Sequence, residues 1–198
     1  INPHFLYNTL DMIRLKAAIN KDTEVSQMLM KLVSFYRLST KVYDSMVAVR
    51  KEVEMLDAYM SLMCYRYSDI IYRSEIEPGA LDIEIPNFIL QPLLENSLMH
   101  GLKDRRYQGT IILKIYRNEQ DKNELNIWLI DDGIGIPDDK MAELNAYNAK
   151  DSEALYRVQT RTEGDRTHLG VINVISRLKL YYQENAEVIY MRNETGGT

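Results

Sequence analysis

Apolar residues recur at intervals of three and four along the first third of the chain. They form three runs, at 5–17, 25–36 and 49–67, and a polar stretch at 20–23 separates the first two. This spacing places the apolar side chains on one face of an α-helix, and Thr23 ahead of the second run is a typical helix start. Because amphipathic helices cannot bury their faces alone, we expect them to pack as a hairpin, often in a dimeric bundle.

The apolar pattern changes after residue 69, where strand-like alternation and helical runs follow one another. Alternation predicts strands, and aliphatic residues at helical spacing predict helices. The expected elements are strands at 70–76, 83–85, 110–117, 124–130 and 188–191, with helices at 88–102, 141–147 and 171–182. The polar segment 138–167 is long for a loop in a compact domain, which indicates a lid or a disordered loop.

The order of these elements predicts the fold class. A β-α-β-β-loop-α-β order favours a mixed sheet with helices layered on one face. We therefore expect an α+β protein in which a helical hairpin at 1–68 precedes an α/β two-layer sandwich at 69–198. A chain of 198 residues is long enough for one core with a helical appendage.

Composition narrows the choice of partners and sites. Hydrophobic residues make up 45% and charged residues 27% of the chain, which is ordinary for a globular protein. The net charge of −5 argues against nucleic acid as a partner, because no basic excess is present to neutralise phosphates. A single cysteine, Cys64, excludes an internal disulfide and a cysteine-rich zinc site, and it fits a reducing compartment.

The chain carries no visible membrane anchor or signal peptide. No apolar run approaches the roughly 18–20 residues that a membrane-spanning helix needs. The sequence starts without methionine and inside a helical pattern, so we expect a fragment of a longer protein. A membrane segment could then lie upstream, while the fragment itself is expected to be cytoplasmic.

The first predicted helix carries a candidate nucleophile. His4 and Asn8 are four residues apart, so they lie one above the other on one helix face. A neutral imidazole nitrogen is a good nucleophile near neutral pH, which makes His4 a candidate phosphoacceptor. Asn8 could bind the ring or the incoming phosphoryl group. The simpler alternative is a surface or helix-capping histidine.

Two later segments carry candidate nucleotide-binding residues. Asn96 and His100 lie one turn apart on a helix whose opposite face is leucine, so both should point away from the core. An amide oxygen suits Mg²⁺, which binds together with substrate phosphates, and His100 could donate to phosphate. Asp131 ends a predicted strand and could accept a hydrogen bond from an adenine amino group, while Gly133 and Gly135 let the backbone approach a ligand. The alternatives are an exposed polar residue and an ordinary hairpin turn.

Gly170 directly precedes the helix predicted at 171–182. Backbone N–H groups at a helix N-terminus form a natural phosphate site, although an ordinary helix start is the alternative. The Gly-x₄-Gly-Lys phosphate loop is absent from the sequence. The segment is therefore a third candidate contact for a nucleotide.

Five motifs, taken in order, resemble those of a known family. They are INPHFLYNTLD, VRKEVEMLDAYMSLMCYRY, LQPLLENSLMHG, DDGIGIP and HLGVINVISRL. They resemble the histidine box, the second dimerisation helix, the Asn box and the two Gly boxes of LytS/YesM-like sensor histidine kinases. The resemblance covers nearly the whole chain. It implies a dimerisation and phosphoacceptor region, truncated at its N-terminus, followed by a Bergerat-type ATP-binding domain that lacks its last strand.

The resemblance also implies roles for the candidate residues. His4 matches the phosphorylated histidine, Asn96 the Mg²⁺ ligand and Asp131 the adenine-binding aspartate. The full implied set is His4 and Asn8 for catalysis, with Asn96, His100, Asp131, Gly133, Gly135, Gly170 and Asn173 for ATP binding. The implied activity is ATP-dependent phosphorylation of His4 and transfer to an aspartate of a response regulator receiver domain. The implied setting is a homodimer with an upstream sensor region in the cell membrane.

Some residues depart from the family pattern. Asp132 stands where Asn is usual, and its extra negative charge near the triphosphate could weaken ATP binding unless the carboxylate faces solvent or Mg²⁺. Phe5 follows His4 where other histidine kinases carry an acid, so no general base is identified. Pro92 stands where Bergerat-fold ATPases carry a catalytic glutamate, which favours the kinase over an ATPase. The alternative function is a nucleotide-binding signalling scaffold with weak or no kinase activity.

Overall fold

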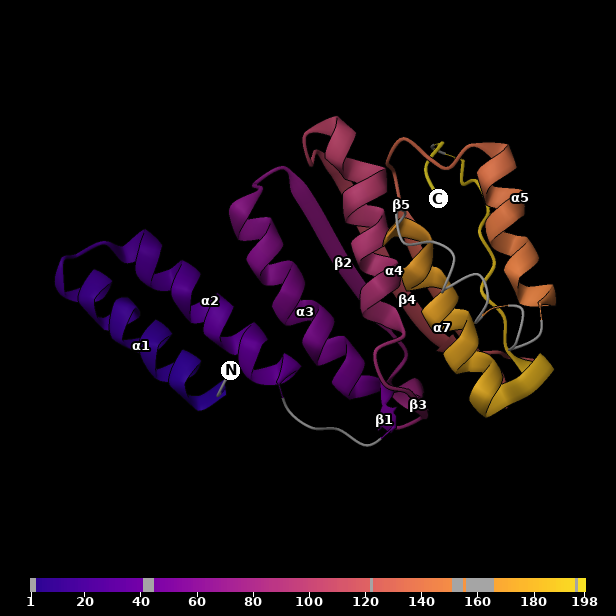
Figure 1. Cartoon of the computed structure of the whole chain (residues 1–198), viewed down its shortest axis with the longest axis horizontal. Coiled ribbons are helices and arrows are strands. Elements are labelled where there is room, and N and C mark those ends of the chain that lie inside the picture. Colours follow the sequence, from indigo (N-terminus) through magenta and orange to yellow (C-terminus); the bar gives the residue numbers. More distant parts are fainter. Residues whose placement is uncertain (1–2, 41–44, 122, 151–154, 156–165, 195) are drawn as a thin grey trace.

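Two antiparallel helices open the chain and project from one side of the molecule (Figure 1). The computed structural model describes residues 3–40, 45–121, 123–150, 155, 166–194 and 196–198. The hairpin consists of α1 (Pro3–Ile19) and α2 (Thr23–Ser39). The Asp22 carboxylate caps α2 by accepting a hydrogen bond from the Val25 amide at 3.1 Å. The predicted hairpin and the break between its helices are therefore confirmed.

A three-stranded mixed sheet forms the centre of the second part. Strand β2 (Ile70–Ile76) pairs in parallel with β4 (Gly109–Arg117), and β4 pairs antiparallel with β5 (Leu125–Asp131). Ile115 lies opposite both Ile76 and Ile127 in this register. All three strands were predicted, β2 from its strand-like run of residues and β4 and β5 from alternation, as was the hairpin between β4 and β5.

A second, two-stranded sheet lies at the end of the helical layer. Strand β1 (Met46–Ala48) pairs antiparallel with β3 (Glu84–Pro86). β3 corresponds to the short strand predicted at 83–85. β1 was not predicted, because three residues are too few to show an alternating pattern.

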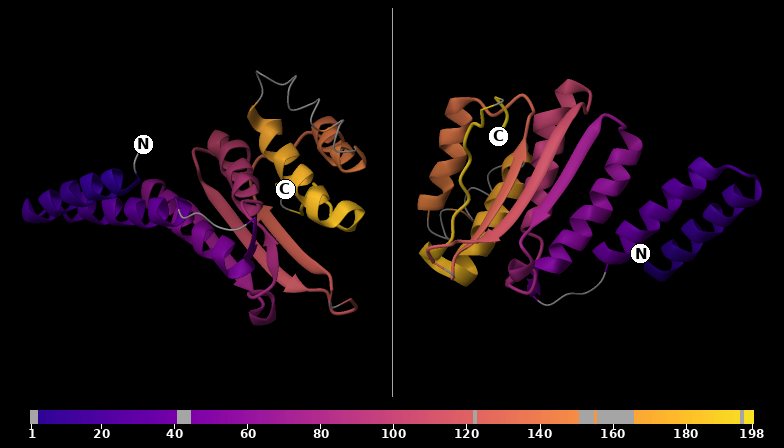
Figure 2. Two further views of the ribbon diagram at one scale, coloured as in Figure 1. Left: turned by 60° about the horizontal axis from the view of Figure 1, so that its bottom comes forward. Right: turned by 180° about the vertical axis from the view of Figure 1, so that it is seen from behind.

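Three helices cover one face of the three-stranded sheet, as Figure 2 shows from two further directions. They are α3 (Val49–Arg66), α4 (Leu90–Asn96) and α7 (Arg166–Tyr182). The core that they form with the sheet includes Val49, Val53, Leu56, Met60, Leu90, Leu94, Leu98, Leu102, Ile111, Leu113, Ile115 and Val174. Alternate residues such as Ile71 and Trp128 point to the other face and are exposed. The α+β class with helices on one face is therefore confirmed.

Helix α3 belongs to both parts of the molecule. Its residues Val49, Leu56 and Met60 are buried in the core between the helices and the sheet. On its other side the Ser61 hydroxyl accepts a hydrogen bond from the Lys31 ammonium of α2 at 2.6 Å. The division of the chain into domains at 68/69 stays a prediction.

The helix that starts at Leu90 runs on beyond α4 with a changed geometry. Residues Ser97–Leu102 form a π-helical turn, and Lys103–Arg105 form a 3₁₀ turn. The predicted helix at 88–102 is confirmed, although it starts at Leu90. Further 3₁₀ turns lie at Pro78–Ala80, Tyr147–Ala149 and Gln183–Asn185.

The polar segment predicted as a lid is described only in part. Helix α5 (Asp138–Ala146) confirms the short helix expected near 141–147. Leu144 of α5 and Tyr147 of the following 3₁₀ turn pack with Ile172 and Ile175 of α7 in a second, smaller core. Residues 151–154 and 156–165 lie outside the described residues, so the lid stays a prediction.

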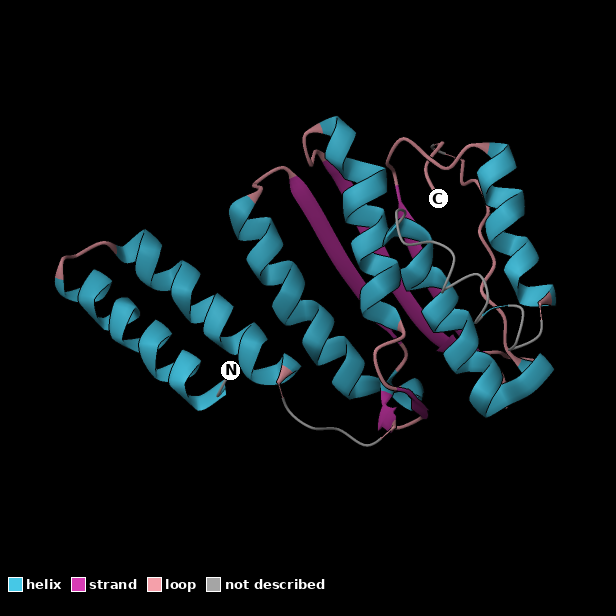
Figure 3. Cartoon of the chain, in the orientation of Figure 1, coloured by secondary structure: helices cyan, strands magenta, loops and turns pink. Residues whose placement is uncertain are grey.

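The strand predicted at 188–191 is wrong. Figure 3 shows this segment as a loop beside α5. The Asn148 amide bonds both backbone groups of Val188, at 3.1 and 2.7 Å, and the Asn145 amide does the same for Tyr190, at 2.7 and 2.8 Å. Because side chains take the hydrogen bonds that a neighbouring strand would take, these residues join no ladder.

The helix start predicted at 171 is also wrong, since α7 begins at Arg166 and Gly170 lies inside it. A single glycine weakens a helix by only about 1 kcal/mol relative to alanine, and tertiary packing overrides that cost. A Cβ at position 170 would lie 3.6 Å from the Pro92 Cβ, so this position faces α4 closely.

Candidate functional site

The predicted adenine-binding aspartate is held in a buried turn. Asp131 ends β5 and is only 3% exposed. Its carboxylate accepts a hydrogen bond from the Gly133 amide at 2.9 Å. Burial raises the pKa of Asp131, whereas hydrogen bonds from Gly133, Ser97 and Thr198 oppose that shift. A buried acceptor of this kind suits a neutral or positively polarised N–H donor on a ligand.

The turn after β5 packs directly on the π-helical turn. A Cβ at Gly133 would lie 2.5 Å from the Gly101 carbonyl carbon, and a Cβ at Gly101 would lie 2.8 Å from an Asp131 carboxylate oxygen. The Ile134 amide also donates to the Gly101 carbonyl at 3.1 Å. Only glycine fits this close approach, so Gly101 is a site residue that the sequence reasoning did not single out.

Asn96 and His100 share one side of a broad groove with Asp131. Leu94, Leu98 and Leu102 are fully buried, whereas Asn96 is half-buried and His100 is exposed. The predicted orientation away from the core is therefore confirmed. The groove runs between α4, β5 and the segment after α7, and its lining includes Asn96, His100, Asp131, Gly135, Tyr190 and Asn193.

The donor set fits a Mg²⁺ ion that is carried in by phosphates. Among the described residues, no cluster of three or more histidine, cysteine, aspartate or glutamate side chains could hold a metal ion alone. Mg²⁺ commonly binds through one or two protein oxygens together with substrate phosphates and waters. The Asn96 amide oxygen at the groove can supply one such ligand.

The Asp132 carboxylate has a backbone partner and a cationic partner. It accepts a hydrogen bond from the Thr110 amide at 2.8 Å, and the Arg105 guanidinium lies 3.7 Å from it. Arg105 also donates to the Asp132 carbonyl. The Thr110 amide in β4 and the Arg105 guanidinium in the 3₁₀ turn at Lys103–Arg105 therefore compensate the negative charge of Asp132, the residue that departs from the family pattern.

The glycine and asparagine candidates are not all brought together. Gly135 has a φ of +72° and packs on Gly196, so it shapes the rim of the groove. Gly133 packs on Gly101, as described above, and is not part of the groove lining among the described residues. Gly170 and Asn173 lie on α7, and neither lines the groove among the described residues.

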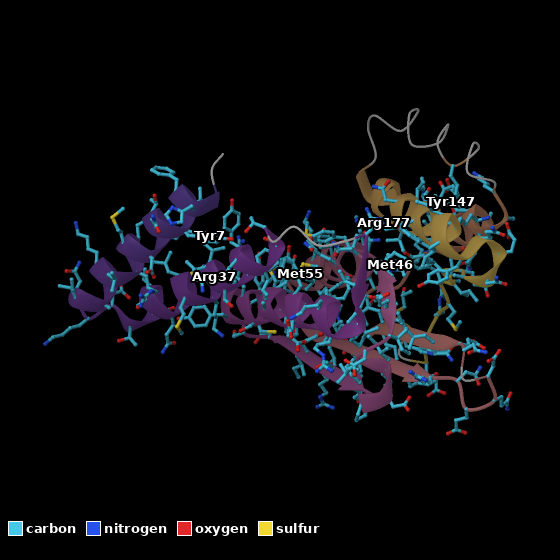
Figure 4. All side chains as sticks on the ribbon, turned by 90° about the horizontal axis from the view of Figure 1, so that it is seen from below. Tyr7, Arg37, Met46, Met55, Tyr147 and Arg177 are labelled. Atoms are coloured by element: carbon cyan, nitrogen blue, oxygen red, sulfur yellow. The ribbon has the colours of Figure 1, made fainter. Side chains whose placement is uncertain are left out.

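His4 is not near the groove in this arrangement. It is exposed on α1, with the Asn8 amide nitrogen 3.4 Å from its Nδ1, as the four-residue spacing predicted. Figure 1 shows that α3 lies between the hairpin and the helices that border the groove. In Figure 4, Tyr7 of the hairpin likewise lies far from Tyr147 and Arg177.

Tyr190 is a groove residue that the sequence did not reveal. Burial raises the pKa of its hydroxyl to about 12, and the nearby Asn96 side chain opposes that shift. Within the described residues the hydroxyl has no hydrogen-bond partner of normal geometry. The sequence pattern around Tyr190 could not show that it lies beside Asn96 of α4, because the two residues are 94 positions apart in the chain.

Comparison with known proteins gives consistent matches. The family described as histidine kinase matches residues 1–71. The chain is 34% identical over 170 residues to the sensor protein LytS of Oceanobacillus iheyensis, covering 81% of the chain and 28% of that protein. It is 27% identical over 192 residues to the sensor histidine kinase YpdA of Escherichia coli, covering 95% of the chain and 30% of that protein. The chain thus spans less than a third of the length of these relatives.

Two further matches are a second LytS protein and a solved structure of a histidine kinase domain. The sensor protein LytS of Staphylococcus saprophyticus is 31% identical over 147 residues, covering 73% of the chain and 24% of that protein. The histidine kinase domain of a blue-light activated histidine kinase from Erythrobacter litoralis superposes with a TM-score of 0.42 and 15% identity, over 83% of this chain and 72% of that one. That score is too low to support an argument about the site. The sequence matches show that the chain belongs to the LytS-like sensor histidine kinases.

Proposed function

We propose that the chain is the kinase part of a two-component sensor protein, which transfers the γ-phosphoryl group of ATP to His4. The observation that carries the proposal is the joint placement of Asn96, His100 and Asp131 on one groove, with Asp131 buried at the end of β5. The names of the relatives support a histidine kinase role. The groove would hold ATP, with adenine at Asp131 and the phosphates near Asn96 and His100.

Each groove residue has a role that follows from its chemistry. The Asp131 carboxylate would accept a hydrogen bond from the adenine amino group. Asn96 would hold Mg²⁺, which neutralises phosphate charge during phosphoryl transfer. Gly133 and Gly135 would keep the turn close to the ligand. A role for Gly170 and Asn173 in ATP binding rests on the sequence resemblance alone, because neither lines the groove among the described residues.

The acceptor chemistry is that of a neutral imidazole. With the Asn8 amide turned so that its oxygen accepts the Nδ1 proton of His4, the imidazole is the tautomer whose Nε2 carries the nucleophilic lone pair. The Nε2–P bond forms while the bond between the γ-phosphorus and the bridging oxygen breaks, and ADP leaves with that electron pair. The Nδ1 proton then passes to solvent. This route needs no acid next to His4, in keeping with Phe5 at that position.

The next steps of the pathway are also part of the proposal. The phosphoryl group would pass to an aspartate on a response regulator receiver domain. A homodimer is supported by the apolar residues exposed on the hairpin, which include Phe5, Met12, Leu15, Ile19 and Met30. Because His4 is remote from the groove, either the hairpin moves or the partner chain presents its histidine.

The wider setting concerns the whole protein. Among the described residues, no helix combines the length and the apolar character required to cross a lipid bilayer. We propose that this part works in the cytoplasm and that the full-length protein carries an upstream sensor region in the cell membrane.

One experiment tests the central step. The chain would be incubated with Mg²⁺ and ATP labelled at the γ-phosphate, in parallel with a His4→Ala variant. We expect an acid-labile, alkali-stable label on the wild type and none on His4→Ala, while both bind ATP. ATP binding without any label would favour the nucleotide-binding scaffold. Loss of ATP binding as well would overturn the assignment of the groove.

A further inference from the structure

A buried carboxylate joins α3 to the start of α4. Glu52 lies on α3 and is only 1% exposed. Its carboxylate accepts hydrogen bonds from the backbone N–H groups of Phe88 at 2.8 Å, Ile89 at 3.2 Å and Leu90 at 3.1 Å. These N–H groups have no acceptor within their own helix, because they precede its first turn. A residue 36 positions earlier in the chain therefore caps α4.

The backbone at this junction is held in an unusual conformation. Phe88 has a φ of +59°, a left-handed conformation that bulky residues rarely adopt. Such conformations persist where the surroundings fix them, and they are frequent at ligand-binding and switch regions. Here the hydrogen bond from the Phe88 amide to Glu52 is the contact that fixes it.

The same junction reaches α7. The Arg177 guanidinium donates to the Asn87 carbonyl, and the Asn87 amide donates to Ser45 at 3.0 Å. Burial raises the pKa of Glu52, whereas the three N–H groups and the Arg177 charge oppose that shift. The Glu52 carboxylate of α3 thus interacts with the start of α4 through hydrogen bonds and with Arg177 of α7 through charge.

The three helices have different tasks in the proposed kinase. α4 carries Asn96, which lies six residues after Leu90, the last of the three residues that bond Glu52. α7 borders the groove through Val171 and Val174. α3 contacts the hairpin, where the Tyr65 hydroxyl donates to the Glu24 carbonyl at 2.9 Å and the Phe35 and Tyr59 rings lie 5.4 Å apart. The junction therefore connects the helix that contacts the hairpin with the helix that carries Asn96.

We propose that Glu52 is a positioning residue, which couples the position of the hairpin-bearing helix α3 to the placement of Asn96 in the nucleotide groove. This inference rests on the proposed function, because it concerns regulation of the same groove. A local cap by Ser, Thr or Asn would satisfy the helix start without burying a charge. A buried carboxylate from another helix is costly unless it is fully bonded, and in return it makes the placement of α4 depend on α3.

A matched pair of variants tests the coupling. Glu52→Gln keeps the size of the side chain but turns an N–H₂ group toward an N–H donor. Glu54→Gln changes an exposed acid two residues away, whose carboxylate forms a surface ion pair with Lys51 at 2.8 Å. We expect Glu52→Gln to bind Mg²⁺·ATP about tenfold more weakly, measured by calorimetry well below its melting temperature, and Glu54→Gln to bind like the wild type.

Amide hydrogen exchange separates coupling from a merely structural role. In the wild type we expect Mg²⁺·ATP to slow exchange at Phe88, Ile89 and Leu90, and also along α3 where it contacts α2. In Glu52→Gln we expect the slowing to stop at α4. A structural cap alone would lower the melting temperature of the variant and leave the spread of ATP protection unchanged.

Each outcome decides the matter. A wild type that binds no Mg²⁺·ATP overturns the proposed function and this inference together. A wild type that binds, with both variants binding equally well, overturns only the coupling by Glu52. If Glu52→Gln fails to fold, exchange in the wild type decides. ATP-dependent slowing at Phe88 to Leu90 that reaches α3 supports the proposal, and unchanged rates there overturn it.

Discussion

The hairpin and the sheet layer are built in opposite ways, although each carries one half of the proposed reaction. No side chain of α2 is fully buried, and His4 is exposed on α1. In the sheet layer Leu94 and Leu98 are 0% exposed and Asp131 is 3% exposed. A phosphoryl acceptor must meet two partners in turn, so exposure suits it. A nucleotide site works by fixed geometry, which dense packing supplies.

The largest difference is expected when the same truncation is made in both regions. Leu94→Ala removes a fully buried side chain, whereas Met30→Ala removes one that is 56% exposed. We expect Leu94→Ala to lower the free energy of unfolding by about 2–5 kcal/mol, and Met30→Ala to change it by less than about 0.5 kcal/mol. Urea denaturation followed by the fluorescence of Trp128, the one tryptophan, measures both. Equal losses would contradict the contrast between the regions.

A substitution at Asp131 should separate binding from stability. Asp131→Asn removes an acceptor for the adenine amino group, and we expect ATP affinity to fall about 10- to 100-fold. Because the folded-state pKa of Asp131 is raised, its stability contribution is fully present below the ordinary pKa of 3.8 and is lost as pH rises through the raised value. As the pH rises from acid to neutral, the wild type should therefore lose free energy of unfolding that the ligand-free Asp131→Asn variant keeps. Calorimetry and unfolding curves at several pH values measure the two effects.

Gly133 should be sensitive to the smallest added side chain. Gly133→Ala places a Cβ 2.5 Å from the Gly101 backbone, whereas at Gly79 the nearest atom lies 3.4 Å away at the end of the Glu77 side chain. We expect Gly133→Ala to lower the free energy of unfolding by about 1–3 kcal/mol, and Gly79→Ala to have a smaller effect. Thermal unfolding of the two variants tests this, and a harmless Gly133→Ala would rule out the close approach.

Asp132 should be the most tolerant of the site positions. Asp132→Asn keeps an acceptor for the Thr110 amide and loses only the partly exposed pair with Arg105. Such pairs contribute less than about 1 kcal/mol. We expect stability and ATP affinity to stay close to wild type in calorimetry. A large gain in affinity would show that the carboxylate charge reaches the phosphates after all.

The sequence predicted the regular elements well because their patterns are local. Helical spacing located α1, α2 and α3, alternation located β4 and β5, and a strand-like run of residues located β2. The spacing of Asn96 and His100, set against buried leucines, gave their orientation. These properties depend on a few neighbouring residues, so the sequence contains them in readable form.

Other features depend on contacts between distant residues. Glu52 lies in a helical pattern, where a glutamate usually faces solvent, and its partners at 88–90 could not be inferred from that pattern. The strand expected at 188–191 failed because Asn145 and Asn148 take its hydrogen bonds. The helix predicted to begin after Gly170 begins at Arg166 instead, because packing of α7 against α4 outweighs the weak helix propensity of glycine.

The shallow packing of α2 also has a consequence for resistance to proteases. A segment without fully buried side chains opens locally at a lower free energy than the global unfolding of the protein. Brief exposure to a protease should therefore cut within the first 40 residues before it attacks the sheet layer. The product that survives would begin near α3 and should still bind nucleotide while it can no longer be phosphorylated.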